Sequence, residues 1–251
     1  MNVATVSEYI VGNYISADRT DTKTFIPFLK KLCSTYPVQR VVADSGYESE
    51  ENYSYVDGSE QLSLFVKPAD HEQKKKRKYK TDIGRRENMA YDAEKDAYTC
   101  AQGKKLQAAA VKKRRSETGY VQEVTVYECA DCKGCPVKAQ CIRQKKTDKK
   151  SLEDRVKRLN VSKYFIQQRK AMEKKISTAE GILLRVNRSI QAEGVFAAIK
   201  EDLNFRRFLT RGNANVTVEW YLVSMAYNIL KLHHKIQTGR LGNHLFVPGA
   251  A

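Results

Sequence analysis

A strand, a short helix and a second strand follow one another within residues 40–66, and this order constrains the fold most. "RVVAD" is a short apolar run, "SEENYSYV" has helical character, and "LSLFV" is a second apolar run. Strand, helix and strand at such short spacing predict a parallel pair in an α/β fold. Open α/β sheets place their chemistry at the carboxyl ends of strands, where Asp44 lies. The alternative role for Asp44 is an N-cap for the helix that follows.

The preceding residues extend this α/β segment. Two runs rich in β-branched and aromatic residues, 2–6 and 9–15, predict a hairpin. Apolar residues at helical spacing then predict a helix over residues 22–36, with Asp21 as its N-cap. Residues 1–66 are therefore expected to be α/β.

The charge of the chain indicates what it binds. Its 251 residues are 41% hydrophobic, enough to bury a sizeable core, and 45 Lys and Arg outnumber 29 Asp and Glu, for a formal charge of +16. This excess favours polyanions, nucleic acid before an anionic membrane surface, although a generally basic, solvated surface is the simpler alternative. Since no apolar run approaches the roughly 18 residues of a membrane span and no signal sequence follows the first Met, we expect a cytoplasmic protein.

The positive charge is concentrated in residues 67–150. This segment has 23 Lys and Arg against 12 Asp and Glu. The run "KKKRKYK" at 74–80 is a candidate for phosphate contacts, although a disordered basic linker would have a similar composition. A second set of candidates for DNA contacts is Lys112, Lys113, Arg114 and Arg115.

Five of the six cysteines also lie in this basic segment. Four follow the pattern C-x2-C-x2-C-x5-C, and the fifth lies upstream on a predicted strand. Thiolates at this spacing can converge on one tetrahedral Zn²⁺, which would have a structural role because a small charged insertion lacks apolar residues for a core. Free thiols and an iron–sulfur cluster are the alternatives. The preferred zinc ligands are Cys100, Cys132, Cys135 and Cys141, with Cys129 as a possible substitute.

Residues 151–251 are expected to be helical. Few helix breakers occur, apart from a predicted break around residues 177–181, and a last helix is predicted within 215–237. Most of the apolar stripe of that last helix is expected in the core: Val218, Leu222, Met225, Ala226, Ile229 and Leu232. Glu193 lies among apolar residues, so its carboxylate is expected to need a partner or a metal. Lys200 follows seven residues later, two helical turns along the same face.

Three stretches together carry a resemblance to a known family. "ADSGYESEEN" at 43–52 resembles the second-aspartate motif of the DDE transposases of bacterial insertion sequences. "QAEGVFAAIKEDLNFRRFLTRG" at 191–212 resembles the stretch with their catalytic glutamate, and Glu193 and Lys200 satisfy its E-x6-K spacing. "YECADCKGCPVKAQC" between the two is similar to the cysteine-bearing insertion of one subfamily. The resemblance covers residues 2 to 237 in a consistent order.

The resemblance implies a partial RNase H-like catalytic core of the α/β class, with a basic, cysteine-containing insertion and a helical C-terminal region. The corresponding domains are residues 1–66, 67–150 and 151–251. In such a core three carboxylates hold two Mg²⁺ or Mn²⁺ ions, and Asp44, Glu193 and Lys200 take catalytic positions. The implied partner is DNA, both transposon ends and target, with a homo-oligomer on the DNA as an open possibility.

The sequence also departs from the family pattern. The family's first aspartate lies upstream of the stretch that matches residues 2–15, so we expect this chain to be a C-terminal portion that an upstream transposase fragment completes. Asp18 and Asp21 match a turn into a helix and are not assigned to that position. Ser189 stands where the motif has an arginine, and Arg185 or Arg188 could supply the phosphate contact instead.

Two other functions remain open from the sequence. A non-catalytic DNA-binding remnant would use the basic insertion and the zinc site without cleaving DNA. A zinc-dependent nucleic-acid adaptor unrelated to transposition is the other, and the ordered motifs disfavour it.

Overall fold

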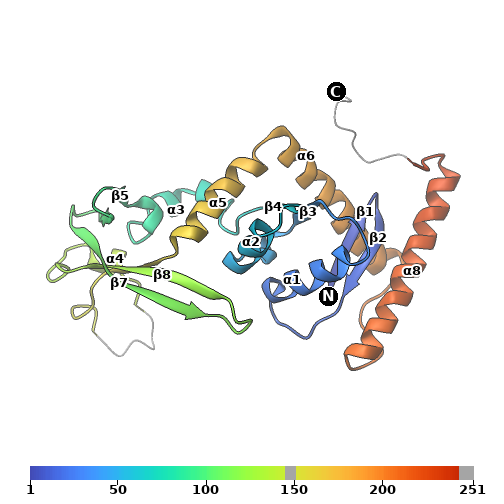
Figure 1. Ribbon diagram of the computed structural model, residues 1–251, viewed down its shortest axis with the longest axis horizontal. Coiled ribbons are helices and arrows are strands. Elements are labelled where there is room, and N and C mark those ends of the chain that lie inside the picture. Colours follow the sequence, from blue (N-terminus) through green and yellow to red (C-terminus); the bar gives the residue numbers. More distant parts are fainter. Residues whose placement is uncertain (145–150, 243–251) are drawn as a thin grey trace. The chain divides into compact units, whose positions relative to one another are not determined.

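The computed structural model describes residues 1–144 and 151–242, and its fold is mixed α/β (Figure 1). The chain forms two compact units, Met1–Pro68 with Lys170–Ala251, and Ala69–Arg169. The sequence predicts boundaries near residues 66 and 150 instead. No helix in the described part of the chain is long and apolar enough to cross a membrane.

The strands of the first unit form two separate two-stranded sheets. β1 (Asn2–Val6) and β2 (Tyr9–Tyr14) are antiparallel, which confirms the predicted hairpin. β3 (Arg40–Ala43) and β4 (Ser63–Val66) are parallel, as predicted from the strand–helix–strand order. Asp44 follows the last residue of β3, so it lies at the carboxyl end of a parallel strand.

Two helices lie between these strands along the chain, one between β2 and β3 and one between β3 and β4. α1 (Asp21–Cys33) is the predicted helix, but its N-cap is Thr20, which makes no side-chain cap bond, and the prediction of Asp21 as N-cap was wrong by one residue. Asp21 is the first helical residue, where its negative charge interacts favourably with the helix dipole. α2 (Glu50–Asp57) is capped by Ser49, whose hydroxyl oxygen accepts from the Asn52 backbone N–H at 3.1 Å.

The helices of the C-terminal part of the chain break where the sequence predicts. α5 (Lys163–Ile176), which contains the boundary between the two units, ends just before Thr178, which caps the next helix. A Cβ at Gly181 would lie 2.3 Å from the Lys175 carbonyl oxygen, so only glycine fits this close approach. The remaining elements are α6 (Ala179–Arg188), the π-helical turn η4 (Ser189–Glu193), α7 (Gly194–Ala197), a second π-helical turn η5 (Ala198–Asp202) and α8 (Asn213–Gln237).

The core of the first unit joins the hairpin to α7, η5 and α8. Its fully buried side chains include Val195, Ile199 and Trp220, and the Trp220 indole N–H donates to the Asn13 side-chain oxygen at 2.8 Å. The face of α8 that the sequence assigned to the core is not the buried face, so that prediction was wrong. Its side chains are exposed at Val218, Leu222, Met225, Ile229 and Leu232, and Ala226 is exposed with them. Apolar periodicity identifies the helix, but Trp220 and Tyr227 on the other face have the larger rings to bury.

The second unit is built on a five-stranded antiparallel sheet whose strands follow chain order. The strands are β5 (Ala90–Asp92), β6 (Ala97–Thr99), β7 (Lys105–Arg115), β8 (Val121–Cys129) and β9 (Arg158–Val161). β9 lies in a stretch predicted to be helical, and that prediction was wrong because pairing with β8 overrides the helix propensity of its short sequence. Short helical turns complete the unit: η2 (Gln73–Lys75), α3 (Arg77–Lys80), η3 (Arg86–Asn88) and α4 (Lys138–Cys141).

The second unit has an apolar core of its own. Tyr98, Leu106 and Tyr127 are buried at its centre together with Met89 and Leu159. The expectation that this insertion lacks apolar residues for a core was therefore wrong. The many charged residues of this segment lie on exposed positions, and the buried positions of its strands carry apolar side chains. The run at 74–80 forms two helical turns in which Lys74 and Lys75 pair with acids, so it differs from the basic linker that was the alternative.

Candidate functional site

Strand β3 and helix α6 lie side by side with the same direction. At their starts, the Arg40 guanidinium lies 3.1 Å from a Glu180 carboxylate oxygen. At their ends, Arg188 Nη1 lies 3.9 Å from Asp44 Oδ1. Four residues of strand span roughly 13 Å and eight residues of helix roughly 12 Å, so the two elements match in length. The carboxyl end of β3 is thereby brought to the end of α6.

Arg188 lies between two predicted catalytic carboxylates. Its Nη1 atom is 3.9 Å from Asp44 Oδ1 and also 3.9 Å from Glu193 Oε1. These oxygens therefore cannot be farther apart than twice this distance, although the two residues lie 149 positions apart in the sequence. The contacts are too long for strong hydrogen bonds, and the attraction is mainly electrostatic. The structure thus brings Asp44, Arg188 and Glu193 together within one unit.

Local hydrogen bonding fixes the Asp44 side chain at the end of β3. Asp44 Oδ1 accepts from the Ser45 backbone N–H at 2.7 Å and caps the short 3₁₀ turn η1 (Ser45–Tyr47). The alternative considered from the sequence, an N-cap for the helix that follows, was wrong, because Ser49 caps α2 and Asp44 caps only the 3₁₀ turn before it. The side chain remains 56% exposed, so a cation can reach it.

Glu193 is held by its helix and not by an apolar pocket. Its side chain is 71% exposed, so the predicted apolar setting was wrong. Val195 and Ile199 turn into the core and anchor the neighbouring residues, while the Gln191 side-chain oxygen accepts from the Glu8 backbone N–H at 3.2 Å. Glu193 ends the π-helical turn η4, and such turns occur frequently at functional sites.

Tyr47 and Asp21 lie at the turn that follows Asp44 and were not predicted as site residues. A Cβ at Gly46 would lie 3.2 Å from Asp21 Oδ2, which places Asp21 against the turn after β3. Burial raises the pKa of Tyr47; the charges of Asp21 and Asp44 raise it further, and Arg188 lowers it. The signal in the sequence was the glycine of "DSGY", whose missing side chain leaves room for the Asp21 carboxylate.

The other predicted residues of this region take different positions. Arg185 lies one turn before Arg188 on α6, and its buried Nε atom has no hydrogen-bond partner in the described structure. Lys200 is exposed on η5, and no ion pair between it and Glu193 occurs among the described residues. Asp18 bonds with the Ser16 hydroxyl in the loop before α1. Of the two arginines left open by the sequence, Arg188 is the one at the carboxylates.

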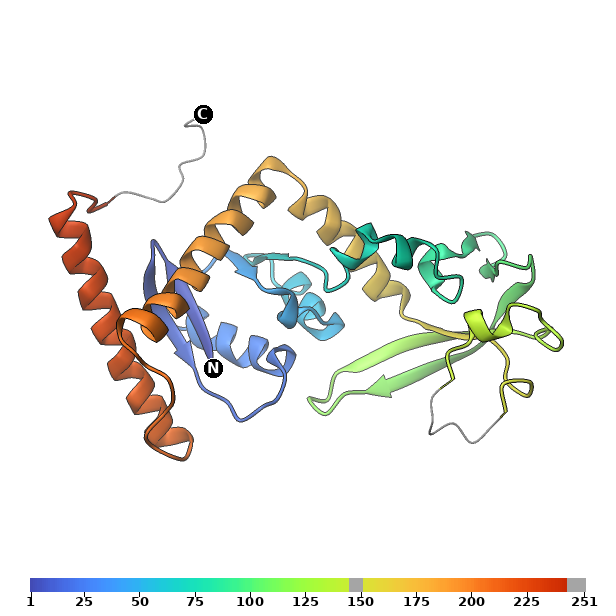
Figure 2. The same ribbon diagram turned by 180° about the vertical axis from the view of Figure 1, so that it is seen from behind.

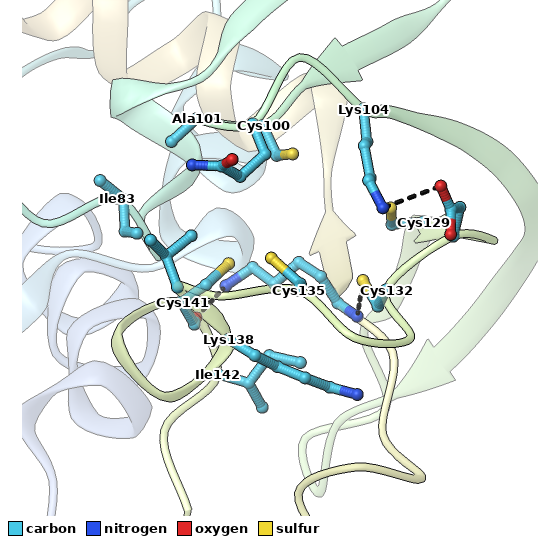
Figure 3. Close-up of a pocket in the computed structure, with 14 residues that line it drawn as sticks. Ile83, Cys100, Ala101, Lys104, Cys129, Cys132, Cys135, Lys138, Cys141 and Ile142 are labelled. Carbon is cyan, nitrogen blue, oxygen red and sulfur yellow. Dashed lines mark hydrogen bonds and ion pairs between the residues drawn. The ribbon is translucent and has the colours of Figure 1, made fainter.

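The five cysteines of the second unit line one small cavity of about 20 Å³, a volume that can hold one water molecule (Figure 3). Cys132 Sγ accepts from the Lys157 backbone N–H at 3.3 Å, a contact that would stabilise a thiolate. Burial and the Cys132 side chain raise the pKa of Cys129 to about 11, and burial raises the pKa of Cys141. Cys33, on α1 of the other unit, is exposed.

The cysteine side chains that line this cavity do not form a complete metal site in the described structure. Within residues 1–144 and 151–242, no three His, Cys, Asp or Glu side chains lie close enough together to hold an ion. The five cysteines nevertheless line one cavity (Figure 3). The donor types suit Zn²⁺, while the carboxylates Asp44 and Glu193 suit a hard cation.

The predicted DNA-contact residues of the insertion lie near the tip of a long hairpin. Strand alternation places Lys112 and Arg114 on one face of β7, and Lys113 and Arg115 on the other. All four are exposed, and of their partners on β8 only Glu123, opposite Lys113, is charged. The outer part of this hairpin, whose backbone Figure 2 shows, therefore presents positive charge on both faces.

Comparison with protein families finds a match to a model described as Transposase DDE domain, over residues 99–233, more than half of the chain. The matched stretch contains the five clustered cysteines, Arg188 and Glu193, whereas Asp44 lies before it. No curated protein matches the chain, and no solved structure matches it.

Proposed function

Because the chain belongs to the family of transposases with a DDE domain, we propose that it contributes two carboxylates, Asp44 and Glu193, to a site that cleaves and joins DNA during transposition. The observation that carries this proposal is the position of Arg188 Nη1, 3.9 Å from an oxygen of each carboxylate. Asp44 lies outside the matched residues, so its assignment rests on this geometry and on the motif around it.

The proposed chemistry is metal-dependent phosphoryl transfer. Bound Mg²⁺ or Mn²⁺ would activate the attacking water or 3′-hydroxyl and stabilise the leaving oxygen. Asp44 and Glu193 would hold the metal through hard oxygen ligands, and both are exposed enough to do so. Arg188 offsets the repulsion between the two carboxylates and can bind a DNA phosphate through its planar guanidinium. The motif lysine, Lys200, is exposed and is proposed to contact DNA from η5.

A third carboxylate is needed to complete the site. We propose that it comes from an upstream transposase segment that completes an RNase H-like core. The separation of the β1–β2 hairpin from the β3–β4 pair supports this, because one more strand could join two such sheets. Asp21 is the competing candidate, since its carboxylate lies beside Gly46.

The β7–β8 hairpin is proposed as the main DNA-binding element of the insertion. A two-stranded ribbon can enter the major groove of B-DNA, whose width is about 12 Å. Positive charge on both faces would then contact phosphates on both walls of the groove. Because the four cations are proposed to contact phosphates and not base edges, binding should show little sequence preference.

A structural zinc ion is proposed for the cavity lined by the cysteines. Cys100, Cys132, Cys135 and Cys141 remain the preferred ligands, with Cys129 as the substitute. The protein should then carry close to one zinc per chain, and Cys135→Ser should lower that content because a three-ligand site holds the ion less tightly. Cys33→Ser is the matched control and should keep the full content. Elemental analysis of reductively purified protein measures it, and a folded sample without zinc would reject the proposal.

The nuclease activity can be tested with a labelled duplex that carries a transposon end. Residues 1–251 alone should not nick it with Mg²⁺ or Mn²⁺, because loss of one carboxylate costs on the order of 5 kcal/mol or more of transition-state stabilisation. Addition of the upstream segment should restore nicking, and Asp44→Ala or Glu193→Gln should abolish it, while Glu201→Gln should not.

Two results of this assay would change the proposal. Nicking by residues 1–251 alone that depends on Asp44 and Asp21 would make Asp21 the third carboxylate. DNA binding without nicking under every combination would favour the second candidate function, a non-catalytic DNA-binding remnant. That candidate has one observation in its support, the lack of a three-carboxylate group in the described part of the chain.

A further inference from the structure

Residues 203–212 form the loop that joins η5 to α8 (Figure 1). At its start, the Phe205 backbone N–H donates to the Ile199 carbonyl oxygen of η5 at 3.0 Å. Phe205 and Phe208 then pack edge to face with their ring centroids 5.2 Å apart, and both rings lie against the buried Trp220 ring. The inner side of the loop is therefore anchored in the core of the first unit.

The Glu219 carboxylate of α8 holds the outer side of this loop. The Leu209 backbone N–H donates to its two oxygens at 2.8 and 3.1 Å. Thr210 donates its backbone N–H at 3.0 Å and its hydroxyl at 2.6 Å to the same carboxylate. The Thr210 hydroxyl and the two backbone donors lower the pKa of Glu219. The backbone at Leu209 is therefore held in one position although it lies at the surface.

The Leu209 side chain extends from this held backbone into solvent. It is 85% exposed, more than any other large apolar side chain in the described part of the chain. A single exposed Leu is ordinary on a protein surface. Leu209 differs in two respects: its backbone is bonded to Glu219, and the ten residues of its loop include three arginines and no acid.

Two of these arginines place unpaired positive charge on both sides of Leu209. Arg206 is the third, and it pairs with Glu201 at 3.3 Å. Arg207 and Arg211 are exposed, and neither forms an ion pair among the described residues. Each lies two positions from Leu209, so its backbone is at most about 7 Å away. An aliphatic side chain between two available cations is complementary to a polyanion that also offers apolar surface.

Duplex DNA is a polyanion with this combination. Proteins that bind the minor groove insert aliphatic side chains between base pairs, use Arg or Lys beside them, and kink the duplex. A single strand fits less well, because separated bases are bound by stacking on aromatic rings, and both rings of this loop pack on the core. We propose that Leu209 enters a base-pair step of duplex DNA from the minor groove, that Arg207 and Arg211 bind the flanking phosphates, and that the duplex bends there.

This inference rests on the proposed function only for the choice of DNA as the partner. The loop and Glu193 belong to the same unit. Ile199, which the start of the loop contacts, lies six residues after Glu193, a rise of about 9 Å along a helix. The loop is therefore close enough to the proposed cleavage site to contact the same duplex.

Fluorescence energy transfer between the ends of a duplex of about 30 base pairs measures the bend. The full chain, at saturating concentration and in EDTA to prevent cleavage, should bend the duplex by at least about 20°, and Leu209→Ala should remove most of this bend. Leu209→Met, which keeps a long apolar side chain, should retain it. Leu241→Ala replaces another exposed Leu of the same unit and should leave the bend unchanged. Circular dichroism establishes that each variant is folded.

Glu219→Ala tests whether the held backbone matters. The variant loses a negative charge, so its affinity for DNA should equal or exceed that of the parent, whereas the bend should decrease. An unchanged bend would contradict the positioning role of Glu219.

The same assay separates failure of this inference from failure of the proposed function. A straight duplex in the parent complex, or equal bends with Leu209→Ala and Leu241→Ala, would overturn the inference even if the completed enzyme nicks DNA. A bend that depends on Leu209, in a chain that does not nick even with the upstream segment, would support the inference and reject the proposed cleavage. A chain that binds no duplex would overturn both.

Discussion

At the candidate site, the positive charge of Arg188 lies between the negative charges of Asp44 and Glu193. Two carboxylates that face each other across a short distance repel, and the guanidinium between Asp44 and Glu193 offsets that repulsion. Exposed ion pairs of this kind are worth only about 0.2–1 kcal/mol each. The arrangement is therefore stable without a metal and yet weak enough for a divalent cation to compete with Arg188 for the same oxygens.

In the second unit, the carboxylate of Asp96 is also held by neighbouring hydrogen-bond donors and a cation. It lies between β5 and β6 at a positive φ of 44°, which Asn tolerates as well. Its carboxylate accepts from the Tyr91 and Tyr127 hydroxyls at 2.6 and 2.7 Å and from Lys163 Nζ at 2.8 Å. These donors, led by Lys163, lower the pKa of Asp96 to about 2.

Asp96→Asn should therefore destabilise the second unit by about 2 kcal/mol, the usual worth of hydrogen bonds to a charged group. Glu94→Gln in the same turn is the control and should have little effect. Because the folded pKa is depressed, the contribution of Asp96 is complete above the unfolded value near 4 and is lost as pH falls towards 2. Hydrogen exchange of the β5–β6 peptide at pH 7 measures the first effect. Acid unfolding measures the second, and an acid midpoint that is unchanged in Asp96→Asn would contradict it.

At the scale of elements, the β7–β8 hairpin carries a prediction on salt dependence. Replacing Lys112, Lys113, Arg114 and Arg115 by Gln should flatten the slope of log affinity against log salt by up to about 0.9 for each DNA phosphate that is no longer neutralised. The measurement is a salt titration of duplex binding, and an affinity that does not depend on salt would contradict electrostatic binding by this hairpin.

The control for this experiment removes the same charge from another element of the unit. Replacing Lys74, Lys75, Lys76 and Lys78 by Gln should change the slope less, because Lys74 and Lys75 already pair with Asp70 and Glu72. Equal effects of the two sets would show that only the net charge of the unit matters.

Helices and strands could be predicted where a short stretch of sequence is enough to identify them. Two β-branched runs around a two-residue turn identify the β1–β2 hairpin, and the order of elements identifies the parallel β3–β4 pair. The exposure of the apolar face of α8 was not predictable, because periodicity locates an apolar face but does not tell what lies against it. β9 was missed for a related reason, since four residues become a strand only through pairing with β8.

The candidate site was predictable in part. The motifs identified Asp44 and Glu193 separately, but their approach depends on α6 lying along β3, a contact between segments that are far apart in sequence. The choice of Arg188 over Arg185 depends on helix rotation, which the sequence left open. Glu193 is exposed at the end of a π-helical turn, whereas its apolar neighbours in the sequence suggested a buried carboxylate.

At the scale of the molecule, the second unit interrupts the first between the two carboxylates. Asp44 precedes the insertion and Glu193 follows it, yet both belong to one compact unit. The insertion has its own sheet, core and cysteine cavity, so it can fold around its own contacts and leave the carboxylates in place. This organisation separates the proposed DNA-binding hairpin from the proposed cleavage site along the chain.

The central claim is that Asp44 and Glu193 belong to one metal site. A double-mutant cycle of Mn²⁺ affinity, followed by electron paramagnetic resonance of the free ion, tests it without requiring cleavage. Asp44→Asn and Glu193→Gln should each weaken binding about tenfold, and the double variant should be little weaker than either, since ligands of one ion do not act additively. Arg188→Ala should tighten binding by roughly 2- to 5-fold, because a competing cation is removed, while Glu201→Gln should have no effect. Additive losses in the double variant, or affinity unchanged in either single variant, would contradict a shared site.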